Sequence, residues 1–190
     1  MKEMRRKDRE MDENFAYSII DKAKFGTLAT IDEGGNPYCI PVSIARCDNK
    51  IYIHSAYQGS KIENIKRNSQ ICMSFVGDVN VPPPGPSGEL EKAMEDPQTF
   101  SKIASQKFTT EFESTVVFGR ANIIEDEKEK ILGLRLLSEK YSPWNMPYFE
   151  AAIEGSLKIT CVIRIDIERI TGKRKKYDKE GVEMKWGRME

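Results

Sequence analysis

FGTLATIDEGGNPYCIPVSIARCDNKIYIHSA, residues 25–56, predicts three short strands joined by tight turns. Phe25–Ile31 is rich in β-forming residues and ends at Asp32–Asn36, a strong hairpin turn signal. Pro37–Arg46 alternates larger apolar residues with small ones, and a polar turn leads from it into a third strand at Lys50–Ala56. Strands joined by such short turns pair antiparallel, so this region predicts an antiparallel meander.

Further elements are expected on both sides of the meander. Residues 5–22 predict an amphipathic helix. Four prolines in Val79–Gly88 exclude a central strand there, and Glu89–Lys107 behind them predicts a helical insertion or a lid. Gly119 predicts a bulge in a long strand, and Asp126 predicts the N-cap of the clearest helix. The remaining predictions are helices at 60–67 and 126–141, strands at 70–76, 112–124 and 160–167, and an additional edge strand at 182–186.

The order of these elements favours an antiparallel sheet over parallel βαβ winding. Parallel winding needs a helix between nearly every pair of strands, and the first three strands have none. We therefore expect a mainly β protein with flanking helices, a six-stranded antiparallel β-barrel. It forms a single domain over residues 1–190 with an insertion at about 80–107. Closing such a sheet would remove its exposed edges.

Composition and charge argue against several classes of function. The 30 basic and 30 acidic residues cancel, which gives no global electrostatic reason to expect nucleic acid or a membrane surface. No apolar run approaches the roughly 20 residues of a membrane span. The charge-dense Met1–Asp12 lacks the apolar stretch of a signal peptide, so we expect a cytoplasmic protein. Four scattered cysteines predict buried, reduced thiols, and a single histidine argues against a transition-metal site.

Ile51–Arg67, IYIHSAYQGSKIENIKR, is the stretch richest in chemistry. Ser60 and Glu63 form an S-x-x-E capping box, which predicts a helix start beside Lys61. Free N–H groups at a helix start attract anions, and Gly59 would let a phosphate approach the main chain. The alternative is that Lys61 is only solvated, that Ser60 only caps the helix, and that Glu63 competes for the same donors.

Two other features flank this helix start. Cys39, Pro41 and Ser43 give the second strand a face of small side chains, where either a flat ring or a neighbouring helix could lie. The only histidine, His54, precedes Ser55-Ala56 at a strand end, where functional residues gather; a hydrogen-bonded structural role is the alternative. The chain has no Ser-His-Asp set, Walker loop or G-x-G-x-x-G motif.

The ordered set of motifs resembles the FMN-binding split-barrel proteins related to pyridoxamine 5′-phosphate oxidase, and within them the nitroimidazole-resistance (Nim-type) group. The matching segments span most of the chain. They are MRRK at 4–7, FGTLAT at 25–30, PYCIPV at 37–42, YIHSA at 52–56, GSK at 59–61 with NI at 64–65, FTTEFESTVVFGRA at 108–121, EKYSP at 139–143 and VIRIDIERITGK at 162–173.

The resemblance implies a homodimer with two flavins, FMN or possibly the larger FAD, in clefts between the subunits. It implies cofactor contacts from three segments. Carried over residue by residue, these are Ile40, Pro41, Val42 and Ser43 beside the isoalloxazine ring, His54, Ser55 and Ala56 lining the cleft, and Gly59, Ser60 and Lys61 at the phosphate. Gly59 departs from the pattern, because oxidase relatives often have an arginine there. Residues 81–107 are extra relative to a minimal member, which leaves room for a lid or for FAD.

The implied activity is flavin-dependent reduction of a nitro group on a small aromatic substrate, with His54 as the candidate catalytic residue. The substrate-binding arginine and histidine of true pyridoxamine-phosphate oxidases have no counterpart that can be located in the tail, which argues against that specific reaction. A non-catalytic flavin or haem binder, with His54 as an axial haem ligand, is the alternative. A purely structural dimer is a third interpretation.

Overall fold

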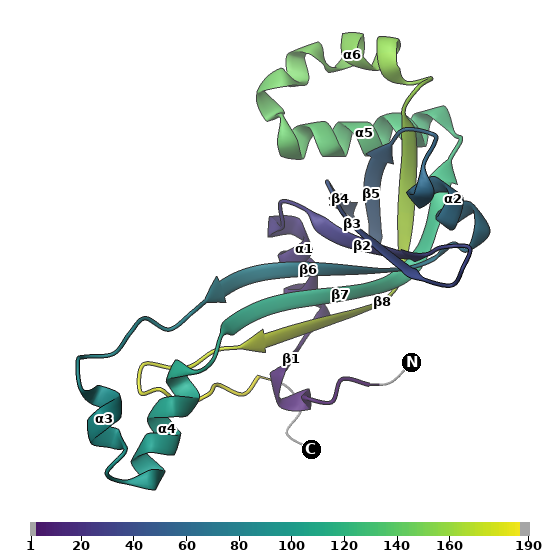
Figure 1. The fold of residues 1–190 in the computed structure, drawn as a ribbon. Helices are drawn as coiled ribbons and strands as arrows, with labels where there is room; N and C mark the ends of the chain where they lie inside the picture. The colour runs from purple at the N-terminus through teal and green to yellow at the C-terminus, as the bar shows by residue number, and fades with distance from the viewer. Residues whose placement is uncertain (1–2, 187–190) are drawn as a thin grey trace.

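The computed structural model describes residues 3–186 and is built around one eight-stranded antiparallel sheet (Figure 1). Across the sheet the order is β3-β2-β6-β7-β8-β5-β4, and β1 pairs with β8. In chain order the strands are β1 (Glu10–Met11), β2 (Gly26–Ile31), β3 (Pro37–Val42), β4 (Ala45–Cys47), β5 (Lys50–Ser55), β6 (Gln70–Asn80), β7 (Glu111–Ile124) and β8 (Cys161–Lys175).

The two ends of this strand order lie almost next to each other in the sequence. Only Ser43 and Ile44 separate β3 from β4. Two residues reach only about 7 Å, so the sheet has to curl back on itself. No strand ladder joins β3 to β4 within residues 3–186, and the barrel is therefore split instead of closed. The predicted mainly β, antiparallel split barrel with flanking helices is confirmed. The two strands beyond the expected six are β1 and the separate β4.

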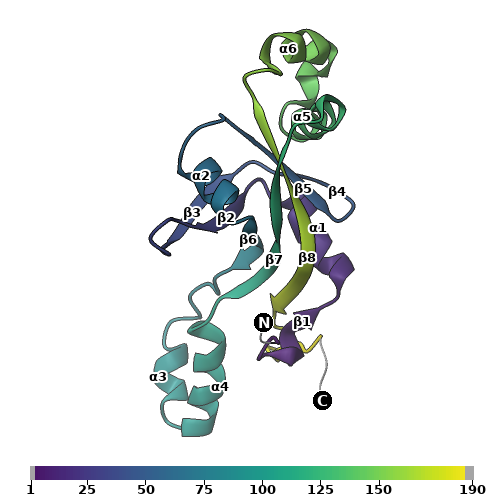
Figure 2. The same cartoon turned by 90° about the vertical axis from the view of Figure 1, so that its right-hand side faces the viewer.

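The helices gather at the two ends of the sheet and along one side (Figures 1 and 2). One end carries α5 and α6, and the far end of the long β6–β7–β8 ribbon carries α3 and α4. The helical bounds are η1 (Lys7–Arg9), α1 (Glu13–Lys22), α2 (Ser60–Arg67), α3 (Glu89–Ala93), α4 (Pro97–Lys107), α5 (Glu127–Tyr141), η2 (Pro143–Tyr148) and α6 (Phe149–Ser156). None of the helices in the described part of the chain has the length and apolar character needed to cross a membrane.

Strand β5 is buried on both faces, which explains where the helices pack. Ile51 and Ile53 face the barrel interior and are fully buried in the main core cluster. Tyr52, between them, points to the opposite face and joins a second cluster with residues of α5 and α6, including Leu134. Each fully buried aliphatic side chain contributes about 1.5–3 kcal/mol. Burial ends at Ile53, and the next residue of β5, His54, is exposed.

Two local predictions are confirmed. The ladder between β7 and β8 shifts register at Phe118/Gly119, as expected for a bulge at this glycine. A Cβ on Gly119 would run into the backbone carbonyl of Asp166, so glycine is required by close approach of the strands. The Asp126 side chain accepts a hydrogen bond from the Glu129 N–H and caps α5 as predicted.

Four predicted boundaries are wrong. The strand expected at 70–76 continues as β6 to Asn80, because Val79 and Asn80 pair with Phe112 and Glu111 of β7. The helix expected at 5–22 begins at Glu13, because the Asp12 side chain caps it there and Glu10–Met11 pairs with β8 instead. The strand expected at 160–167 continues to Lys175, since β7 offers a partner along its whole length. The strand expected at 182–186 is reduced to a single bridge between Tyr177 and Glu183.

The predicted capping box and the predicted burial of the cysteines also need correction. Gly59 is the N-cap of α2, Ser60 is its first helical residue, and no side chain caps this helix. A glycine at φ +104 already turns the chain into the helix, which displaces Ser60 from the capping position. All four cysteines are free as expected, but only Cys161 is buried; Cys39 is exposed because its face of β3 is uncovered.

Candidate functional site

The end of β5 and the start of α2 bring several predicted residues together. His54 and Ser55 stand opposite Val162 and Cys161 of β8 in the ladder. Residues 56–59 then form a short exposed connection to Ser60, where α2 begins. The His54 side chain is exposed and that of Ser55 is half-buried, so both are accessible at this edge of the sheet.

The Lys61 ammonium interacts electrostatically with His54 of β5 and Cys161 of β8. Partial burial lowers the pKa of His54, and the nearby Lys61 ammonium lowers it further. Partial burial also lowers the pKa of Lys61, while the Cys161 thiol opposes this shift. No acidic side chain within residues 3–186 forms an ion pair with Lys61. The site therefore has a neutral imidazole at pH 7 and an uncompensated positive charge.

The backbone at the start of α2 is open. The carbonyl of Gly59 accepts from the N–H groups of Ile62 and Glu63, at 2.9 and 3.1 Å. The N–H groups of Ser60 and Lys61 come before these and have no hydrogen-bond partner within residues 3–186. A Cβ built on Gly59 meets nothing within 4 Å, so the approach to these donors is clear. This arrangement suits an anion such as a phosphate.

The second predicted segment, on β3, presents a different surface. Val42 is buried in the main core and Ile40 packs against it, so their side chains face inward. Pro41 and Ser43 are exposed on the outer face, and Thr27 of β2 stands opposite Pro41. A ligand on this face would meet Pro41 and Ser43 directly, but Ile40 and Val42 only through their backbone.

The β2–β3 hairpin and α2 are neighbours in space. Both views of the ribbon place α2 beside this hairpin (Figures 1 and 2). A buried hydrogen bond of 3.0 Å from Asn64 of α2 to the Thr30 hydroxyl of β2 fixes the contact. Helix α2 therefore packs against the buried face of β2, and the small-residue face of β3 is the outer face of the same hairpin.

The sequence analysis did not identify one further residue near this site. Lys130 of α5 is only 6% exposed. It donates hydrogen bonds to the Tyr57 hydroxyl at 3.0 Å and to the Leu157 carbonyl at 2.6 Å. Its signal was present in the sequence, because Lys130 lies on the same helical stripe as Leu134 and Leu137, where an apolar residue is expected.

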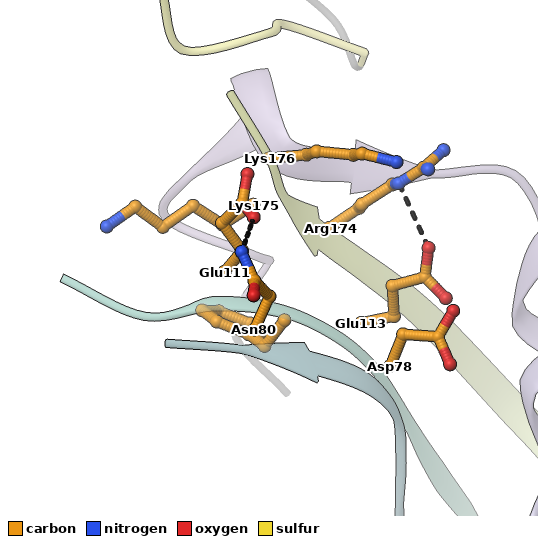
Figure 3. A pocket seen from close by; sticks show the side chains of 8 residues that line it. Asp78, Asn80, Glu111, Glu113, Arg174, Lys175 and Lys176 are labelled. Atoms are coloured by element: carbon orange, nitrogen blue, oxygen red, sulfur yellow. Dashed lines mark hydrogen bonds and ion pairs between the residues drawn. The ribbon is translucent and has the colours of Figure 1, made fainter. Parts of the chain in front are cut away.

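A separate pocket of about 330 Å³ lies on β6, β7 and β8, toward the end of these strands that carries α3 and α4 (Figure 3). It contains none of the residues predicted from the sequence. Its charged groups largely satisfy each other: Glu113 pairs with Arg174 at 3.0 Å, and Glu111 accepts from the Asn80 amide at 2.5 Å. Its lining residues are Asp78, Asn80, Glu111, Phe112, Glu113, Arg174, Lys175 and Lys176.

Comparison with solved structures shows the same fold in proteins of low sequence identity. A candidate 5-nitroimidazole antibiotic resistance protein from Bacteroides thetaiotaomicron is 22% identical with a TM-score of 0.67, over 87% of this chain and 86% of that one. An FAD-binding protein from Mesorhizobium loti is 20% identical with a TM-score of 0.57, over 87% and 96%. The FAD and heme binding protein from Mycobacterium smegmatis is 14% identical with a TM-score of 0.67, over 96% and 77%.

Sequence comparison identifies the family. No curated protein matches the chain. The family model described as pyridoxamine 5′-phosphate oxidase matches residues 12–174, which is most of the sequence and includes all three predicted site segments. The resemblance inferred from the ordered motifs is thereby confirmed, and the protein belongs to the pyridoxamine 5′-phosphate oxidase family.

Proposed function

We propose that the protein binds a flavin, with FMN as the first choice, and uses it to reduce small nitro-aromatic or related aromatic substrates. One observation carries the binding part of this proposal. The start of α2 combines an uncompensated Lys61 ammonium, two free backbone N–H groups and open space over Gly59. A phosphate supplies the negative charge that this arrangement lacks, and charge-assisted hydrogen bonds to it are the strong ones.

Two different segments of the chain would contact the phosphate and the ring of the flavin. Ser60 and Lys61 would hold the phosphate, and the glycine at position 59 leaves room for it. The exposed outer face of β3 at Pro41 and Ser43 would border the ring, because its small side chains leave the backbone accessible. A bound flavin supplies electron transfer as hydride or single electrons, which the protein's own side chains cannot carry.

His54 is the residue placed to handle a proton. Its lowered pKa keeps the imidazole neutral at pH 7, with one nitrogen able to donate a hydrogen bond and the other able to accept one. Its exposed position at the end of β5 makes it accessible to a substrate. We assign it the role of orienting the substrate and exchanging a proton with it.

The protein is expected to act as a homodimer with the flavin at the subunit interface. The support is the uncovered outer face of β2 and β3, where Thr27, Cys39 and Pro41 are all exposed although they sit on neighbouring strands. A second copy over this face would enclose a ring that a single copy leaves open to water. Sedimentation velocity of the purified protein tests the stoichiometry.

A non-catalytic binder is the second candidate. Within the described residues, no hydrogen bond or ion pair occupies the exposed His54 side chain, so its nitrogens are free to ligate a haem iron. The Mycobacterium smegmatis structure of the same fold is named for both FAD and heme. A spectrum with a Soret band, and no turnover of nitro-aromatic compounds, would favour this candidate over the oxidoreductase.

The decisive experiment is a spectrum of the purified protein followed by titration of the apo-protein with FMN. We expect flavin absorbance and a defined Kd. Lys61→Ala should weaken FMN binding by about 1.5–3 kcal/mol, or roughly 10- to 150-fold, through loss of a charge-assisted contact. The matched control is Lys102→Ala, an exposed lysine on α4 at the opposite end of the molecule. Equal FMN affinity in the two variants contradicts the assignment of Lys61.

A further inference from the structure

Lys130 is a buried lysine whose hydrogen-bond partners are all neutral. Its ammonium donates to the Tyr57 hydroxyl and the Leu157 carbonyl, at 3.0 and 2.6 Å, and it lies 5.5 Å from the centre of the Tyr57 ring. Within residues 3–186, no carboxylate forms an ion pair with it. At 6% exposure this is an unusual position for a lysine, because buried charges are normally paired.

The neutral partners satisfy hydrogen bonds without cancelling the charge. A lysine ammonium has three donors, and only two of them are used here. A buried charge with no opposite charge beside it is costly to keep in a fold. The two hydrogen bonds to neutral groups offset only part of that cost, so the burial of this ammonium calls for a further role.

The position of Lys130 indicates this role. Tyr57 belongs to the short connection between β5 and α2, two residues before Gly59. Leu157 follows α6 and precedes β8, whose first residue, Cys161, stands opposite Ser55. The lysine thus links α5 to the connection that leads into α2 and to the segment between α6 and β8.

The same region concentrates positive charge. Burial raises the pKa of the Cys161 thiol, and three nearby ammonium groups, Lys130, Lys61 and Lys66, act in the opposite direction. All three are therefore close enough to the first residue of β8 to act on its thiol. Lys130 is the buried member of this group, where charge is least screened by water.

We propose that Lys130 is a positioning residue for the phosphate group of the flavin. Its buried ammonium ties the Tyr57 connection to Leu157, which fixes the Gly59–Lys61 backbone, and its charge adds to the attraction for a phosphate. This inference rests on the proposed function, because it needs the flavin phosphate at the start of α2. It assigns to Lys130 a share of the affinity that comes from the phosphate and none of that which comes from the ring.

The test compares FMN with riboflavin, which has the same ring but no phosphate. Kd values for both are measured by quenching of flavin fluorescence with wild type, Lys130→Met and Lys128→Met. Lys128 is exposed on the same helix and gives the same change in net charge. We expect Lys130→Met to lower the ratio of FMN to riboflavin affinity by about tenfold or more, and Lys128→Met to leave this ratio unchanged.

The remaining results would overturn the role proposed for Lys130 or the proposed flavin binding itself. An affinity ratio in Lys130→Met equal to that of Lys128→Met overturns the inference, because a merely structural lysine would affect ring and phosphate alike. If Lys130→Met does not fold, Tyr57→Phe takes its place, since it removes only the hydroxyl. An unchanged FMN affinity in Tyr57→Phe then overturns the inference. If the wild-type protein binds neither ligand, the proposed function itself fails, which is a different result.

Discussion

Two helical glycines offer a direct test of how tightly α5 packs on the barrel. A Cβ on Gly133 of α5 would lie 2.9 Å from Tyr52 Cδ1 and 2.9 Å from Val162 Cγ1, well inside van der Waals contact. Neither neighbour has room to move, since Tyr52 is 1% exposed and Val162 is fully buried. The Tyr52 hydroxyl is also held by Glu129 at 3.1 Å. A Cβ on Gly155 of α6 meets nothing within 4 Å.

The substitutions Gly133→Ala and Gly155→Ala share one favourable contribution and differ in one unfavourable contribution. Both gain helix propensity, up to about 1 kcal/mol. Only Gly133→Ala carries the cost of overpacking, about 1–3 kcal/mol. The difference between the two variants isolates this cost, so we expect Gly133→Ala to be less stable than Gly155→Ala by about 1–3 kcal/mol.

Urea denaturation followed by circular dichroism measures both variants against wild type, with equal m-values as the check that the comparison is valid. In thermal scans, each kcal/mol corresponds to a shift of about 2–4 °C for a chain of this length. We expect Gly155→Ala to melt above wild type or level with it, and Gly133→Ala to melt clearly below Gly155→Ala. Equal stability of the two variants would refute the close packing of α5 against Tyr52 and Val162.

The remaining predictions concern pH. Because His54 is the only histidine, its C2–H proton gives a single imidazole resonance by NMR, and we expect a titration midpoint below 6.5 in the free protein. The unfolded chain then binds more protons, so the free energy of unfolding should fall as pH drops through about 6.5. FMN should raise the midpoint, since its phosphate favours the imidazolium. A midpoint above 6.5 without ligand contradicts the partial burial of His54 beside the Lys61 ammonium. Burial, with a smaller contribution from Glu129, raises the pKa of Tyr52 to about 12. The contribution of Tyr52 to the free energy of unfolding is therefore complete below pH 10 and lost as pH rises through about 12. Tyr52→Phe should make the free energy of unfolding less dependent on pH in that range.

The features that the sequence determined are those that depend on neighbouring residues alone. Alternation and turn residues were enough to predict the β2–β3 hairpin, since a turn needs a particular backbone conformation whatever surrounds it. Gly119 predicted the bulge for the same reason, and Asp126 predicted the start of α5. The anion site at Gly59 and Lys61 stays a prediction, and the capping role given to Ser60 was wrong.

Contacts between segments distant in sequence decided the strand pairing and the burial of individual side chains. The single strand expected at 37–46 became β3 and β4 because the two halves have different partners, and alternation does not say which partner a strand will find. Lys130 appeared on an apolar helical stripe, but its burial depends on Tyr57 and Leu157, which are 73 and 27 residues away in the chain. Local sequence sets which face a side chain takes. Only the folded chain sets what that face meets, because the contacts that bury or expose a residue come from segments far away in sequence.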